Sequence, residues 1–164
     1  VFDVVKLLDF GLAKPTMEKG VDTQLTLAGT VTGSPLFMSP EQAIGDHEPD
    51  ARSDIYSLGA VAYFLLTGVP PFDGDKALKV IMAHVQQAVI PPAQLQPEIP
   101  ADLEQIVLRC LAKDPADRFQ TAASLGAALA SCSAAGLWSD QQARQWWRAN
   151  TGVNSTSVRA VQVA

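Results

Sequence analysis

One stretch of the sequence is apolar almost all the way round a helix, and it constrains the fold more than any other feature. It runs from Ser53 to Gly68 and contains the run AVAYFLL. Ser53 or Asp54 can cap its start, because a side-chain oxygen there can accept a backbone N–H. Gly68 can end it in a left-handed conformation, and two prolines follow. A helix without a polar face is normally buried on every side, so this stretch predicts a central core helix.

The composition fits one domain with an apolar core. The chain has 164 residues, of which 48% are hydrophobic and 18% are charged. Its net charge is −5, and no cluster of Lys and Arg occurs, which argues against nucleic acid or an anionic membrane as the main partner. Cys110 and Cys132 are too few for a disulfide framework, as is usual in a reducing compartment.

Targeting signals are also absent from the sequence. It contains no signal peptide and no apolar stretch long enough to span a membrane. We therefore expect a cytoplasmic location, and a membrane anchor outside this sequence stays open. His47 and His84 stand alone, without the spacing of metal ligands.

The remaining pattern predicts a mainly helical chain with one short strand. Val1–Leu8 is rich in β-branched residues and predicts the strand, whereas the proline-containing stretch 88–99 predicts extended chain. Helices are predicted over residues 40–44, 76–86, 101–111, 122–130 and 140–149. Thr121 and Ser139 are expected to cap the last two. The predicted core residues include Tyr63, Phe64 and the stripe Ala77, Leu78, Ile81, Met82 and Val85.

Several short motifs follow one another in a characteristic order. They are Asp9-Phe10-Gly11 after the strand, GSPLFMSPE ending at Glu41, DIYSLG on the central helix, and DPADR ending at Arg118. No single motif is specific, but their order and spacing resemble the C-terminal lobe of a eukaryotic-type protein kinase. The residues within the motifs are similar to those of bacterial Ser/Thr kinases. The resemblance covers Val4 to Ala130 and implies a kinase-like helical lobe around a buried central helix, without the N-terminal lobe.

The resemblance implies roles for the residues of the first motif. Asp9 matches the aspartate that binds the Mg²⁺ bridging the phosphates of ATP. Phe10 matches the phenylalanine whose packing reports the active state, and Gly11 lets the backbone turn. Asp9, Phe10 and Gly11 are therefore the expected cofactor-binding residues, and Asp9 is the expected metal ligand. Outside this context Asp9 would be a turn-initiating aspartate after a strand.

Residues 12–41 match the activation segment of the family. Its candidate phosphorylation sites are Thr23, Thr26, Thr30 and Thr32, with Thr26 our first choice, although threonines are also common in any loop. Phosphate on such a residue can order the segment by pairing with arginine. The expected substrate-docking loop is Gly33, Ser34 and Pro35, where Ser34 stands in place of the threonine usual in Ser/Thr kinases.

Three further residues match structural positions of the family. Glu41 is expected to pair with Arg118 and so tie the activation segment to the helical lobe. Asp54 is expected to cap the central helix and to hold the backbone of the catalytic loop.

The residues that carry out the chemistry are not in the sequence. Only eight residues precede Asp9, and the family places the catalytic loop and the N-terminal lobe upstream of that point. No catalytic residue is therefore present. We expect a fragment of a Ser/Thr kinase that transfers the γ-phosphoryl group of ATP to Ser/Thr hydroxyls of proteins. The isolated chain is expected to be inactive and to bind neither ATP nor magnesium, and its expected partners are the missing N-terminal lobe and a protein substrate.

Two other interpretations remain open. One is a non-catalytic half-kinase that binds a protein partner, and the other is an unrelated helical scaffold. For the kinase interpretation we expect a partial kinase domain over residues 1–130, a helical extension over 131–149 and a disordered tail or linker over 150–164. We expect the tryptophans of the extension, Trp138, Trp146 and Trp147, to pack against the lobe.

Overall fold

The fold is helical throughout the residues that the structure describes. The structure is a computed structural model, and it describes residues 35–45 and 49–150, among which no strand occurs. Its elements are η1 (Pro35–Phe37), α1 (Pro40–Ile44), α2 (Ala51–Thr67), α3 (Ala77–Gln86), α4 (Pro92–Leu95), α5 (Ala101–Cys110), η2 (Pro115–Asp117), α6 (Ala122–Ser131) and α7 (Asp140–Asn150). The mainly α architecture is as expected, while the predicted strand Val1–Leu8 lies outside the described residues.

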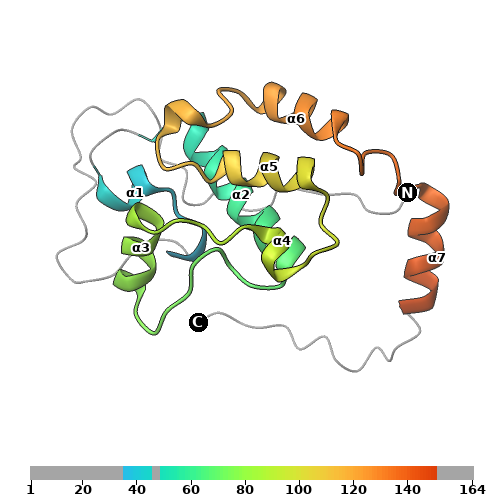
Figure 1. Cartoon of the computed structure of the whole chain (residues 1–164), viewed down its shortest axis with the longest axis horizontal. Helices are drawn as coiled ribbons and strands as arrows, with labels where there is room; N and C mark the ends of the chain where they lie inside the picture. The colour runs from blue at the N-terminus through green and yellow to red at the C-terminus, as the bar shows by residue number, and fades with distance from the viewer. Residues whose placement is uncertain (1–34, 46–48, 151–164) are drawn as a thin grey trace. The chain divides into compact units, whose positions relative to one another are not determined.

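The chain divides into two compact units. Helices α1 to α6 belong to one unit, and α7 belongs to the other. In the first unit, α5 packs across α2, α6 lies against α5, and α1 lies against α3 (Figure 1). Helices α2 to α6 with the loops between them are here called the helical lobe. None of the described helices is long and apolar enough to cross a membrane.

The long helix α2 is capped differently from the prediction at its start and as predicted at its end. Asp50, neither Ser53 nor Asp54, is the N-cap, and its carboxylate accepts the Arg52 N–H at 2.8 Å. The predicted Asp54 cap is therefore wrong, because the helix begins three residues earlier and Asp54 lies exposed within its first turn. Gly68 ends the helix with φ of 79°, a conformation that favours glycine.

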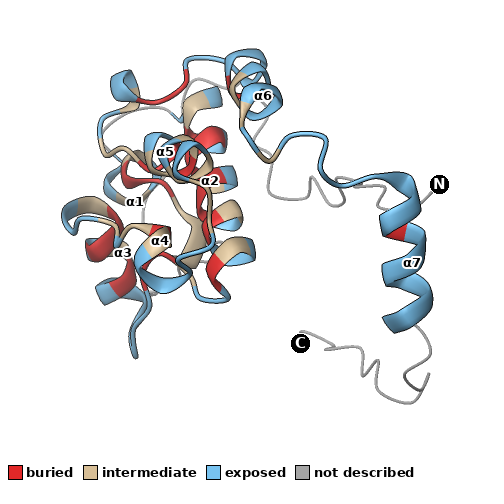
Figure 2. Cartoon of the chain, turned by 45° about the vertical axis from the view of Figure 1, so that its right-hand side comes forward, coloured by how far each residue is buried: buried red, intermediate tan, exposed pale blue. Residues whose placement is uncertain are grey.

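Burial of α2 is confined to one side (Figure 2). Tyr56, Ala60 and Tyr63 are at most 1% exposed and form a core with Val107 of α5 and with Leu111, which follows α5. The prediction of burial on every side is wrong, since Leu65 is 76% exposed and Phe64, expected in the core, is 41% exposed. An apolar sequence does not say how many neighbours a helix has, and here one side of α2 lacks a partner among the described residues.

The crossing of α2 and α5 depends on a glycine. An added Cβ at Gly59 would lie 2.5 Å from the Cβ of Cys110, closer than two carbon atoms can approach. Glycine therefore lets the two helix backbones come together and buries Cys110. This close contact joins the central core to a second cluster formed by Ile55, Cys110, Phe119 and Leu125.

Helix α3 turns a different face inward from the one predicted. Its buried residues are Val80, Ala83 and His84, whereas Leu78 and Met82 from the predicted stripe are 66% and 42% exposed. The sequence offers apolar residues on more than one side of this helix. The face that is buried is the one on which His84 finds hydrogen-bond partners.

The proline-containing stretch after α3 also differs from the prediction of extended chain. It contains the short helix α4, which starts at Pro92. Proline is tolerated at the first helical position because its missing N–H would have no partner there. The carboxylate of Glu104 accepts the Ala93 N–H at 2.6 Å and fixes this turn to α5.

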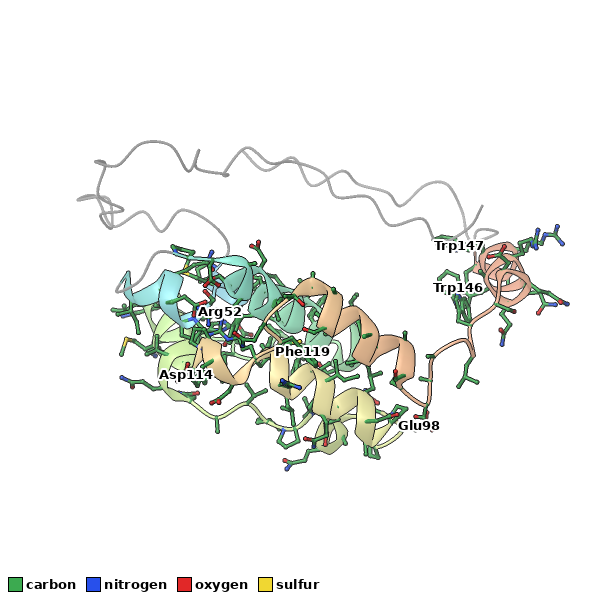
Figure 3. All side chains as sticks on the ribbon, turned by 90° about the horizontal axis from the view of Figure 1, so that it is seen from above. Arg52, Glu98, Asp114, Phe119, Trp146 and Trp147 are labelled. Carbon is green, nitrogen blue, oxygen red and sulfur yellow. The ribbon has the colours of Figure 1, made fainter. Side chains whose placement is uncertain are left out.

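The last two helices follow their predicted caps. Thr121 accepts the Ser124 N–H at 3.1 Å to start α6, and Ser139 accepts the Gln142 N–H at 3.3 Å before α7. Asn150 is the last residue of α7 and not the first of a tail, and residues 151–164 lie outside the description. On α7 the rings of Trp146 and Trp147 meet edge to face, 5.0 Å apart (Figure 3). Packing of the tryptophans against the lobe stays a prediction.

Candidate functional site: the anchor of residues 35–41

The short helix α1 is held at both ends, which fixes the position of Glu41. At its start, Ser39 and Gln42 form a capping box, in which Gln42 Oε1 accepts the Ser39 N–H at 3.0 Å. Pro40 occupies the first turn, where its fixed φ suits a helix. At its end, Gly45 adopts φ of 74° and donates its N–H to the Glu41 carbonyl at 2.9 Å. These caps hold the single turn of α1 in place and so fix the direction of the Glu41 side chain.

The carboxylate of Glu41 binds the guanidinium of Arg118 in a bidentate ion pair. Nη1 donates to Oε1 at 2.7 Å and Nη2 donates to Oε2 at 2.8 Å. The two residues are 77 positions apart in the sequence. The Arg118 side chain is 0% exposed and that of Glu41 is 10% exposed, so the pair is shielded from water. This contact, expected from the family resemblance, ties residues 35–41 to the loop between η2 and α6.

Every N–H of the Arg118 guanidinium has an acceptor. Besides the two carboxylate oxygens, the backbone carbonyls of Ala112, Arg52 and Lys113 accept at 2.8 to 3.0 Å. Arginine has five N–H donors and remains charged in proteins, so a buried guanidinium needs such a complete set. Arg118 is therefore built into the lobe, and Glu41 is the charge that balances it.

The loop that carries Arg118 is itself ordered by a cap. Asp114 accepts the Ala116 N–H at 2.8 Å and starts the turn η2, after which Arg118 is extended. Asp114 and Arg52 lie near each other at one end of the lobe (Figure 3). The sequence DPADR thus folds locally into a turn that directs its arginine inward.

A serine completes the carboxylate site. Ser53 is 1% exposed and donates its hydroxyl to Oε1 of Glu41 at 2.6 Å. Burial raises the pKa of Glu41, but the hydrogen bonds from Arg118 and Ser53 outweigh it and lower the pKa to about 2. Glu41 is therefore ionised at neutral pH. Ser53, expected as a helix cap, instead serves this carboxylate.

A second contact holds the other end of residues 35–41. Nε2 of His84 lies 3.1 Å from the Leu36 carbonyl, and Nδ1 lies 2.8 Å from the Tyr56 hydroxyl. Burial, together with the charge of Lys113, lowers the pKa of His84 to about 4, so the imidazole is neutral at pH 7. No role for this histidine was predicted from the sequence. Its spacing of four residues from Val80, on one side of α3, was the available signal.

Lys113 also holds α3 to the rest of the lobe. Its ammonium donates to the His84 carbonyl at 2.6 Å and lies 4.5 Å from the centre of the Phe72 ring. Burial and the nearby Arg118 charge lower its pKa to about 8. This lysine joins the loop before η2 to α3, and so connects the two contacts that hold residues 35–41.

Most of the predicted site residues lie outside the described residues. These are Asp9, Phe10, Gly11, Thr23, Thr26, Thr30, Thr32, Gly33 and Ser34. Of the predicted docking loop only Pro35 is described, as the first residue of η1. Within residues 35–45 and 49–150, no group of three His, Cys, Asp or Glu side chains could hold a metal ion. The site described here is thus an anchor for residues 35–41.

Comparison with known proteins identifies the family of this arrangement. The model of the protein kinase domain matches residues 2–128. The serine/threonine-protein kinase PknB of Mycobacterium leprae is 46% identical over 127 residues, which are 77% of this chain and 20% of that protein. PknB of Mycobacterium tuberculosis matches with the same identity and coverage. A probable serine/threonine-protein kinase of Clostridium acetobutylicum is 41% identical over 120 residues, 73% of this chain and 18% of that protein.

These relatives are much longer than the chain, which spans about a fifth of the length of the PknB proteins it matches. The matched region includes α1 to α5 and most of α6, and therefore both partners of the Glu41–Arg118 ion pair. By this match over most of its residues, the chain belongs to the protein kinase domain family.

Proposed function

We propose that this chain supplies the activation segment and the helical lobe of a Ser/Thr protein kinase. The kinase would transfer the γ-phosphoryl group of ATP to Ser and Thr hydroxyls of proteins. The observation that carries the proposal is the buried ion pair of Glu41 with Arg118. It holds the end of the proposed activation segment to the lobe, six residues after the proposed docking loop Gly33–Pro35 in the sequence. The names of the relatives support the Ser/Thr class.

The roles proposed for residues 9–32 follow from the family resemblance. Asp9 would hold Mg²⁺ through its carboxylate, because this hard cation prefers oxygen ligands. A metal ion bound there would neutralise charge on the ATP phosphates during transfer. Phe10 and Gly11 would complete this cofactor-binding segment. Thr23, Thr26, Thr30 and Thr32 are the proposed phosphorylation sites.

The chain of 164 residues is proposed to be inactive on its own. Phosphoryl transfer depends on positioning and on charge neutralisation, and the sequence contains no H-R-D-x-K-x-x-N catalytic loop. Its partners would be the N-terminal lobe of a kinase and a protein substrate. We further propose that the kinase portion covers residues 1–130 and that residues 131–149 form an extension, which the family match over residues 2–128 supports.

A joined protein tests the proposal. The N-terminal part of the Mycobacterium tuberculosis relative, up to the start of the matched region, is fused to this chain, and transfer from labelled ATP to a mixed protein substrate is measured. The joined protein is expected to label serine and threonine and to need Mg²⁺, whereas the chain alone is expected to label nothing. Asp9→Asn in the joined protein is the matched control and should abolish labelling. A folded joined protein that binds ATP yet labels nothing would contradict the proposal.

One observation favours a second candidate, a non-catalytic module that binds a protein. Leu78 and Met82 on α3 are exposed and line a shallow hollow together with Asp73 and Lys79. Exposed apolar residues beside charged ones are common at protein-binding surfaces. Retained Asp9 and Gly11 argue against this candidate, since a pure binding module has no use for a metal ligand. The inert outcome of the joined protein would favour it.

A further inference from the structure

The imidazole of His84 is buried between two aromatic rings. The residue is 0% exposed, and its ring meets Tyr56 and Phe72 edge to face with centroids 5.6 and 4.9 Å away. Such packing leaves no route for a substrate or an attacking group to reach the ring. A direct chemical role for His84 is therefore excluded. Its role must lie in the two hydrogen bonds that its ring nitrogens make.

The partners of His84 determine its tautomer. The Leu36 carbonyl can only accept a hydrogen bond, so Nε2, 3.1 Å away, must carry the proton and donate it. Nδ1 of the neutral ring is then an acceptor, and the Tyr56 hydroxyl, 2.8 Å away, must donate to it. The chain of donors runs from Tyr56 on α2 through His84 on α3 to the backbone at Leu36. All three groups are satisfied in this single arrangement.

The end of this chain of hydrogen bonds lies next to the proposed docking loop. Leu36 follows Pro35 directly in the turn η1, and the next residue, Phe37, packs edge to face on Phe64 of α2 at 6.4 Å. The Leu36 side chain also packs against the cluster of Phe72, Val80 and Ala83, and the other contacts between residues 35–41 and the lobe lie at Phe37 or beyond. Among the described hydrogen bonds made by side chains, the one to the Leu36 carbonyl is the nearest in the sequence to Gly33 and Ser34.

We propose that His84 is a positioning residue for protein-substrate docking: its Nε2–H holds the Leu36 carbonyl and thereby fixes the turn η1 (Pro35–Phe37), which contains the described end of the proposed docking loop. The docking role rests on the proposed kinase function, whereas the positioning of η1 by His84 can be tested without that function.

Two substitutions separate the two hydrogen bonds. The amide of glutamine reaches about as far as Nε2, so His84→Gln can keep the donation to Leu36 while it loses the acceptor for Tyr56. Asparagine reaches only about as far as Nδ1, so His84→Asn can keep the contact with Tyr56 while it loses the one with Leu36. Both variants remove the same ring, and each serves as the control of the other.

In the full chain, hydrogen exchange of the amides of residues 36–38 is the first readout. His84→Asn is expected to speed their exchange about tenfold relative to His84→Gln, the factor expected for the loss of one buried hydrogen bond. Equal exchange in two variants of equal global stability would overturn the proposal. In the unsubstituted chain, nitrogen NMR should show a protonated Nε2 and a bare Nδ1 at pH 7. The opposite tautomer would overturn it even where a variant fails to fold.

In the joined protein, His84→Asn should raise KM for a protein substrate about tenfold, with kcat and KM for ATP within about twofold of the parent. His84→Gln should restore the lower KM. A His84→Asn variant with unchanged KM, or with kcat and both KM values altered together, would overturn the docking role. A joined protein that is inert even without a substitution would instead refute the proposed kinase function. The hydrogen-exchange result would then test only whether His84 positions η1.

Discussion

The guanidinium carbon of Arg118 lies 4.9 Å from the centre of the Tyr56 ring. The same Tyr56 donates its hydroxyl to His84, which in turn holds the Leu36 carbonyl. Arg118 itself holds Glu41. Tyr56 on α2 is therefore in contact with both groups that fix residues 35–41, and the two ends of this segment are fastened around one buried aromatic ring.

The ion pair should be a large contributor to the stability of the lobe. Glu41→Ala leaves the Arg118 charge buried without a partner and is expected to lower the free energy of unfolding by about 3–5 kcal/mol. Glu41→Gln keeps two hydrogen-bonding atoms and should cost less. Chemical denaturation of the three proteins measures the difference. A loss below about 1 kcal/mol for Glu41→Ala would show that the pair behaves as an exposed one.

Two glycines in helices should respond in opposite directions to alanine. Gly59→Ala places a Cβ 2.5 Å from the Cβ of Cys110, so α2 and α5 must move apart, at a cost of about 1–3 kcal/mol. Gly126 on α6 has open space at the same point, and Gly126→Ala should stabilise the lobe by roughly 0.5–1 kcal/mol. Thermal unfolding distinguishes them. Destabilisation by both would mean that the contact of α2 with α5 is not what selects Gly59.

Stability should fall in acid in two successive ranges. The pKa of His84 is lowered from 6.5 to about 4, so its contribution is complete above pH 6.5 and is lost as the pH falls towards 4. The pKa of Glu41 is lowered from 4.5 to about 2, so its contribution is lost between those values.

Denaturation at a series of pH values tests this account. In the first range the slope should reach up to about 1.4 kcal/mol per pH unit for one proton. His84→Gln should flatten the curve between pH 6.5 and 4.5 and leave the lower range in place. A curve for His84→Gln that retains the full slope would assign the upper range to other groups.

The exposed side of α2 predicts self-association of the chain alone. Leu58 is 53% exposed and Leu65 is 76% exposed, and apolar residues at such spacing on one helix attract further apolar surface. The double variant Leu58→Gln and Leu65→Gln should reduce aggregation and leave the unfolding transition of the monomer within about 1 kcal/mol. Sedimentation and light scattering measure the first effect. A parent chain that stays monomeric with a high, cooperative melting transition would contradict the prediction.

Local signals in the sequence predicted many of the helix ends. Thr121, Ser139 and Gly68 act within one turn of their own helix, so their effect does not depend on the rest of the fold. At the start of α2, by contrast, Ser53 and Asp54 were the predicted caps and Asp50 is the observed one. The Ser53 hydroxyl donates to Glu41 instead, and this tertiary contact cannot be predicted from the residues around Ser53.

For a similar reason, the periodicity of the sequence could not predict which face of α3 is buried. Apolar residues occur on two sides of this helix, and the buried side is the one that carries His84, whose hydrogen-bond partners lie on other elements. The pairing of Glu41 with Arg118, in contrast, was expected from the family resemblance. Contacts between residues distant in the sequence were thus predictable where both partners belong to a recognised motif. His84 belongs to none.

The most direct test of the whole account is a map of phosphate in the joined protein after incubation with ATP and Mg²⁺. The account predicts phosphate on one or more of Thr23, Thr26, Thr30 and Thr32. It predicts none in the chain alone, and none in the joined protein with Asp9→Asn. Phosphate on the isolated chain, or none on a folded joined protein that binds ATP, would contradict the assignment of this chain as the activation segment and helical lobe of a Ser/Thr kinase.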